Sequence, residues 1–152
     1  MILPLSLTFA ALCAILNLWL SMRVGQARGQ AKILHGDGGN PYLVKKMRAH
    51  ANFVEYAPFV LILFVLVELA YGSQSWLWAV IVAYALARIV HALGMDADKF
   101  SMARGIGISI NHLVLLGLAG AALYAAYGFT QPAVTTVNVG TLNAPAQPAQ
   151  SR

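Results

Sequence analysis

The segment KMRAHANFVEYAPFVLILFVLVELAYG, residues 46–72, decides the fold of this chain. Its second half, from Phe59 to Val67, contains only apolar residues, as a helix in lipid requires. Its first half carries Arg48, Asn52 and Glu55. A charged side chain at the bilayer centre costs about 2.5–3.5 kcal/mol on insertion scales, so such residues usually face other helices or a wet cavity. The segment therefore predicts a membrane helix with one polar face.

The composition is that of an integral membrane protein. Of 152 residues, 59% are hydrophobic and 10% charged, whereas soluble domains are about 25% charged. Four apolar segments have about the 17–25 residues that cross a bilayer. They predict an all-α, integral membrane four-helix bundle over residues 1–128, with helices at about 2–22, 46–70, 76–93 and 104–127. The first segment lacks a basic leader and a small-residue cleavage site, so we expect a retained helix. Residues 129–152 are rich in Pro, Thr, Ala and Gln and predict a flexible tail.

The basic charge indicates topology. The net charge is +5, and nine of the ten Lys and Arg residues fall toward one side of the predicted bundle, leaving only Arg152 on the other. The positive-inside rule then makes the connections 23–47 and 94–104 cytoplasmic and puts both termini outside. Because this partition accounts for the charge, we expect a lipid bilayer as the partner and no nucleic acid.

Polar residues in the predicted helices point to a site at the basic end. A step of about 100° per residue puts Arg48, Asn52 and Glu55 within an arc of about 60°. The other helices repeat this spacing at the same end, with Tyr84, Arg88 and His91 in the third and Arg104 and Asn111 in the fourth. Three helices thus direct cations and amide groups toward one region, which favours a site for a charged ligand.

Structural roles remain open for each of these residues taken singly. Arg48 and Arg104 can be anchors whose guanidinium groups extend to the lipid headgroups. Asn52 and Glu55 can hydrogen-bond between helices, and Glu55 can pair with an arginine. Glu68 lies near the outer end, on the opposite face from Glu55, and is expected at the membrane interface or in a subunit contact.

The stretch RAHANFVEYAP, residues 48–58, resembles the R-A-x-x-N-x-x-E-Y-x-P signature of the MAPEG family, the membrane-associated proteins of eicosanoid and glutathione metabolism. The resemblance covers about residues 1–128 and is greatest to small bacterial members. It implies a homotrimer of four-helix bundles in a bacterial inner membrane, with glutathione bound between subunits near the cytoplasmic face. Family members conjugate glutathione to electrophiles, reduce lipid hydroperoxides or isomerise prostanoids.

The resemblance implies how glutathione is held. Glutathione has two carboxylates and one ammonium group, so its site needs several cations and one anion. Arg23, Arg48 and Arg88 can bind carboxylates with two parallel hydrogen bonds. Glu55 can bind the γ-glutamyl ammonium, and Asn52 can hydrogen-bond the peptide.

The resemblance also implies a catalytic residue, Arg104, at the start of the fourth helix. Its charge, together with the helix N-terminus, would favour the glutathione thiolate over the thiol. Tyr56 matches the family tyrosine after the glutamate, and His50 points away from the site and can serve that of an adjoining subunit. His91 and Met95 stand where eicosanoid enzymes of the family have tyrosines.

These inferences favour a membrane-bound glutathione-dependent transferase or peroxidase that acts on hydrophobic electrophiles or lipid hydroperoxides. Glutathione would be the co-substrate, and no metal is expected. One alternative is a non-catalytic protein with the MAPEG fold. Another is a small proton-coupled exporter, which would place its essential carboxylate near the middle of the bilayer; Glu55 lies closer to the boundary, beside arginines.

Overall fold

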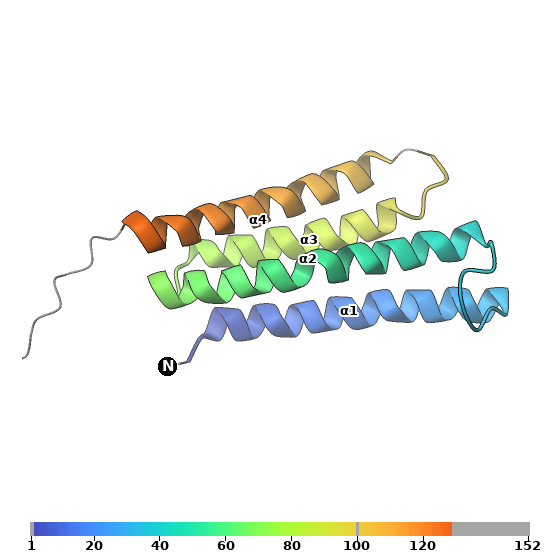
Figure 1. Cartoon of the computed structure of the whole chain (residues 1–152), viewed down its shortest axis with the longest axis horizontal. Helices are drawn as coiled ribbons and strands as arrows, with labels where there is room; N and C mark the ends of the chain where they lie inside the picture. The colour runs from blue at the N-terminus through green and yellow to red at the C-terminus, as the bar shows by residue number, and fades with distance from the viewer. Residues whose placement is uncertain (1, 100, 129–152) are drawn as a thin grey trace, which may run out of the picture.

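The computed structural model describes residues 2–99 and 101–128, and the predicted tail lies outside them. The chain folds into four helices: α1 (Pro4–Ala31), α2 (Pro41–Tyr71), α3 (Trp76–Gly94) and α4 (Met102–Gly128). Successive helices run in opposite directions, as Figure 1 shows. Each is long and apolar enough to cross a membrane, and no strand occurs in the described residues. The predicted all-α membrane architecture is confirmed.

The first two helices extend beyond the predicted ranges. α1 continues past residue 22 to Ala31, and α2 begins at Pro41, so most of the predicted connection 23–47 is helical. Residues 23–31 (RVGQARGQA) contain Arg, Gln and Ala, which favour helix in water as well as in lipid. Hydropathy therefore located the membrane crossing and missed the helix ends.

Local signals set these ends. Lys32 adopts a left-handed conformation (φ 55°) that stops α1. Asn40 caps α2, because its side-chain oxygen accepts the backbone N–H groups of Tyr42 and Leu43 at 3.0 and 3.1 Å. Pro41 suits the first turn, where no N–H is needed. A short link over residues 32–40 thus holds α1 and α2 antiparallel.

The bundle core is apolar, and α4 is its most exposed member. α1 packs on α2 and α3 on α4, while α4 also contacts α2 but makes no contact with α1 in the described part of the chain. The rings of Phe64 and Tyr84 pack against that of Phe9 in the core, tilted and edge-on respectively, with centroids 4.7 and 5.2 Å from the Phe9 centroid. α3 and α4 approach closely near the basic end, where a Cβ on Gly107 would lie 2.6 Å from the Ala87 carbonyl oxygen. This close approach fixes the start of α4 against the end of α3.

The expectation for Glu68 was wrong, because its side chain is wholly buried inside the bundle. The carboxylate accepts the backbone N–H groups of Leu5 at 3.2 Å and Ser6 at 2.6 Å. It also accepts the hydroxyls of Ser6 at 2.5 Å and Ser73 at 2.6 Å. The residue before α1, Leu3, offers no side-chain cap. Glu68 of α2 supplies that cap from a distance and joins α1, α2 and the α2–α3 link at the outer end.

Candidate functional site

A cavity of about 400 Å³ opens at the basic end of the bundle, between α2, α3 and α4. Its wall contains four of the residues predicted for the site, together with two apolar residues. They are Arg48 and Asn52 of α2, His91 of α3 and Met95 directly after it, and Arg104 and Ile108 of α4. Residues far apart in the sequence thus meet at one place.

The residues of the cavity wall follow the periodicity of a helix. The lining residues form three pairs, each with a spacing of four positions in the sequence. Residues with this spacing lie about one helical turn apart on the same face. α3 and α4 are also joined directly, because His91 Nδ1 lies 3.1 Å from the Arg104 carbonyl oxygen, at hydrogen-bonding distance. The end of one helix therefore fixes the beginning of the next.

Arg88 lies behind this wall and not in it. The side chain is only 1% exposed and stands over the Phe53 ring, with 5.4 Å between the guanidinium carbon and the ring centroid. One of its N–H groups donates to Asn52 Oδ1 at 3.0 Å. Its Nε and Nη1 have no acceptor within the described residues. Because Arg88 occupies the Asn52 oxygen, the Asn52 amide keeps its N–H groups as donors for a ligand.

The charges of the wall have one sign. Arg48 and Arg104 are both exposed, and neither forms an ion pair with any residue that the structure describes. No carboxylate of the described residues lines the cavity. Two guanidinium groups facing a partly enclosed space favour an anion, since the low-dielectric walls concentrate their field.

Arg23 has a different partner from the one expected. Its Nη2 lies 2.5 Å from Asp96 Oδ2, and its Nη1 donates to the Ala92 carbonyl oxygen at 3.2 Å. Lys46 Nζ lies 2.6 Å from the other oxygen of Asp96. Sequence reasoning missed this carboxylate, although an acidic residue just beyond the third helix, among basic helix ends, was a usable signal.

The remaining predicted residues of α2 do not line the cavity. Glu55 is exposed and lies about 4.5 Å deeper along the helix than Asn52, at 1.5 Å per residue, so it falls beyond the cavity. The Tyr56 ring packs edge-on against the His112 ring, with centroids 5.3 Å apart. His50 Nε2 lies 2.9 Å from Asn17 Oδ1 of α1, as expected for a residue directed away from Asn52.

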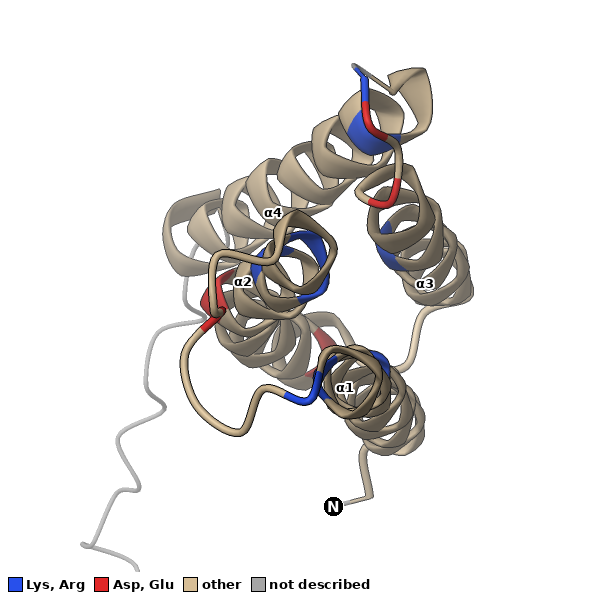
Figure 2. Ribbon diagram, turned by 90° about the vertical axis from the view of Figure 1, so that its right-hand side faces the viewer, with Lys and Arg blue, Asp and Glu red and all other residues tan. Residues whose placement is uncertain are grey.

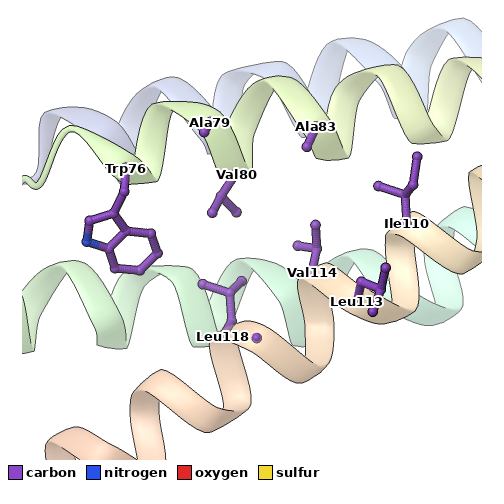
Figure 3. A pocket seen from close by; sticks show the side chains of 9 residues that line it. Trp76, Ala79, Val80, Ala83, Ile110, Leu113, Val114 and Leu118 are labelled. Carbon is purple, nitrogen blue, oxygen red and sulfur yellow. The ribbon is translucent and has the colours of Figure 1, made fainter.

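A second, apolar groove lies between α3 and α4 farther from the basic end. It holds about 440 Å³, and apolar side chains of the two helices face one another across it, as Figure 3 shows. Trp76, Ala79 and Ala83 contribute from α3, and Val114 and Leu118 from α4. The groove offers contact area to an acyl chain or an aromatic ring and no charged group for catalysis.

Fold and cavity together define a class: a four-helix membrane protein with a cationic site at one end of its bundle. The comparison with known families is more specific. Residues 6–124 match the MAPEG family, and the chain belongs to it. The protein named "Inner membrane protein YecN" in two strains of Escherichia coli is 32% identical over 112 residues, which cover 73% of this chain and 84% of the relative. The predicted membership is confirmed, and the relatives support the predicted location in a bacterial inner membrane.

Proposed function

We propose that this protein binds glutathione in the basic-end cavity and uses it as a transferase or peroxidase toward hydrophobic electrophiles or hydroperoxides. The observation that carries the proposal is the convergence of Arg48, Asn52 and Arg104 on a space that no carboxylate lines, in a MAPEG chain. Glutathione has two carboxylates and net negative charge at neutral pH, so it matches a cationic wall.

Each group in the wall has a role that its chemistry supports. Arg48 grips a glutathione carboxylate with paired hydrogen bonds. Asn52, oriented by Arg88, donates to a peptide carbonyl. Arg104 is the third residue of α4, so its charge and the positive helix end act in the same direction. Both favour the thiolate of a thiol whose ordinary pKa is about 8.5.

The thiolate then does the chemistry. With an electrophile, a sulfur–carbon bond forms and the leaving group departs with the bonding electrons. With a hydroperoxide, sulfur attacks the terminal oxygen, the oxygen–oxygen bond breaks, and an alcohol leaves after taking up a proton. A second glutathione converts the resulting sulfenic acid to the disulfide and water. The apolar groove between α3 and α4 offers the hydrophobic co-substrate a binding surface on the bundle.

The site is completed by a second copy of the chain. Glu55 is exposed within an apolar helix and is flanked by Val54, Phe59 and Ile62, which are 49–63% exposed. A carboxylate facing lipid is costly, so this face calls for cover by protein. A homotrimer would cover it and bring Glu55 toward the ammonium group of glutathione bound between subunits.

Met95 supports a second candidate, a binding protein without turnover. A thioether lines the cavity at this position and cannot donate the hydrogen bond that a tyrosine hydroxyl would supply to a reacting group. This candidate predicts glutathione binding with no acceleration of conjugation by the wild-type protein.

The two candidates are separated by an activity assay on matched variants. The purified protein in detergent is given glutathione and either a small aryl halide or an organic hydroperoxide. Arg104→Ala should lower kcat at least about tenfold, because it removes one charge-assisted interaction that contributes about 1.5–3 kcal/mol. Lys99→Ala removes a cation from the same end at an exposed position outside the cavity and should leave kcat unchanged. Equal rates for the wild type and Arg104→Ala would refute the catalytic role.

A further inference from the structure

Asp96 joins three helices beside the cavity. It lies two residues beyond the end of α3 at Gly94, and its two oxygens lie 2.5 Å from Arg23 of α1 and 2.6 Å from Lys46 of α2. Both cations are largely buried, with side chains 12% and 7% exposed. Lys45 adds a weaker contact to the Asp96 carbonyl oxygen at 3.4 Å. Figure 2, viewed along the bundle from this end, shows acidic residues among the Lys and Arg residues at the helix ends.

This ion-pair cluster is connected to the cavity wall. Asp96 follows Met95, which lines the cavity, and His91 belongs to the same last stretch of α3. The backbone of Gly94 packs directly on the backbone of Arg104, where a Cβ would overlap the Arg104 nitrogen. The position of the end of α3 therefore sets the position of Arg104. Asp96 fixes that end against α1 and α2.

We propose that Asp96 is a positioning residue of the glutathione site, an inference that rests on the proposed function. It has two effects. It holds Arg104 at a constant distance from Arg48 and Asn52, and it neutralises Arg23 and Lys46 so that they do not compete for the carboxylates of glutathione. Asp96 thus selects which cations at this end remain free to bind the substrate.

Loss of this charge should lower turnover without a matching loss of binding. In Asp96→Asn, two largely buried cations lose their counter-ion, which strongly disfavours the present arrangement of the helix ends. The freed cations then attract glutathione, while Arg104 loses its fixed place. We expect kcat to fall about tenfold or more, and the Kd for glutathione to stay within about threefold or to tighten.

Asp98→Asn is the matched control. Asp98 lies two residues away, with a side chain that is 96% exposed, and its one ion pair among the described residues is with Lys45 at 2.5 Å. That hydrogen bond from Lys45 holds the pKa of Asp98 below its ordinary value, so the control removes the same charge from the same link. Because Asp98 does not contact Arg23 or Lys46, this variant should keep the wild-type kcat and Kd.

The experiment measures kcat, the Kd by calorimetry, and backbone hydrogen exchange without glutathione. Faster exchange in residues 91–96 and 102–108 of Asp96→Asn, with unchanged exchange in Asp98→Asn, supports the positioning role even if the wild type fails to bind glutathione. Unaltered exchange and kcat in Asp96→Asn overturn the proposal, as does a loss of affinity in proportion to kcat. If Asp96→Asn does not fold, Lys46→Gln removes one side of the cluster only. It should give a smaller fall in kcat in the same direction, and wild-type kcat and exchange in Lys46→Gln would overturn the proposal.

Discussion

Removal of the Glu68 carboxylate should destabilise the bundle strongly while leaving its basic end intact. The carboxylate is wholly buried and accepts four hydrogen bonds, two of them from the first backbone N–H groups of α1. In Glu68→Ala these groups lose their acceptor at a place that water reaches poorly. α1 would then lose its only N-terminal cap among the described residues.

The structure sets the magnitude. Two orphaned backbone N–H groups cost about 1–3 kcal/mol each, so we expect a loss of about 2–6 kcal/mol in the free energy of unfolding. Glu68→Gln keeps the shape and one acceptor oxygen but loses the charge. Hydrogen bonds to neutral groups are weaker, so this variant should lose about 1–2 kcal/mol. Glutathione binding should persist in Glu68→Gln, because Glu68 lies about 30 Å from Arg48 along α2 at 1.5 Å per residue.

The assay is reversible unfolding in mixed micelles, followed by tryptophan fluorescence as denaturing detergent is added. Asp98→Ala is the control, since it removes an exposed carboxylate and should not change the midpoint. A Glu68→Ala midpoint equal to that of Asp98→Ala would refute the role of Glu68 as the cap of α1.

Three further predictions concern the site and its setting. Arg48→Ala should weaken glutathione binding at least about tenfold by calorimetry, because a charge-assisted hydrogen bond contributes about 1.5–3 kcal/mol; unchanged affinity would leave Arg48 as a lipid anchor. Arg104→Ala should move the pKa of the bound glutathione thiol back toward about 8.5, measured by thiolate ultraviolet absorbance; a wild-type titration curve would contradict its role. Single cysteines introduced at His35 and Gln74 should be labelled from the cytoplasmic and outer sides respectively. The reverse labelling pattern would show that the predicted orientation in the membrane is wrong.

Much of the fold could be predicted because membrane helices are specified locally. A run of apolar residues long enough to cross the bilayer is visible in the sequence, and all four runs became helices. The helix ends were harder, since residues 23–31 are polar and yet helical. Glu68 was misplaced for a related reason. Its partners, Leu5 and Ser6, are 63 and 62 residues away in the sequence. No local sequence pattern indicates that a helix is capped by a side chain from another helix.

The site was partly predictable for the same reason. Helical spacing grouped Arg48, Asn52 and Glu55 on one face; Arg48 and Asn52 line the cavity, and Glu55 does not. Spacing cannot report depth or tertiary partners, so Arg88 was expected to face the ligand and instead lies behind Asn52. The pairing of Arg23 with Asp96 depends on how α1 meets the end of α3, which only the folded bundle defines.

Direct titration of the wild-type protein with glutathione tests the central claim, that the basic-end cavity is a glutathione site. Calorimetry in mild detergent should show saturable binding, and the double variant Arg48→Ala/Arg104→Ala, which removes both free guanidinium groups from the wall, should abolish it. A folded wild-type protein without saturable binding, or a double variant that binds as the wild type does, would contradict the claim.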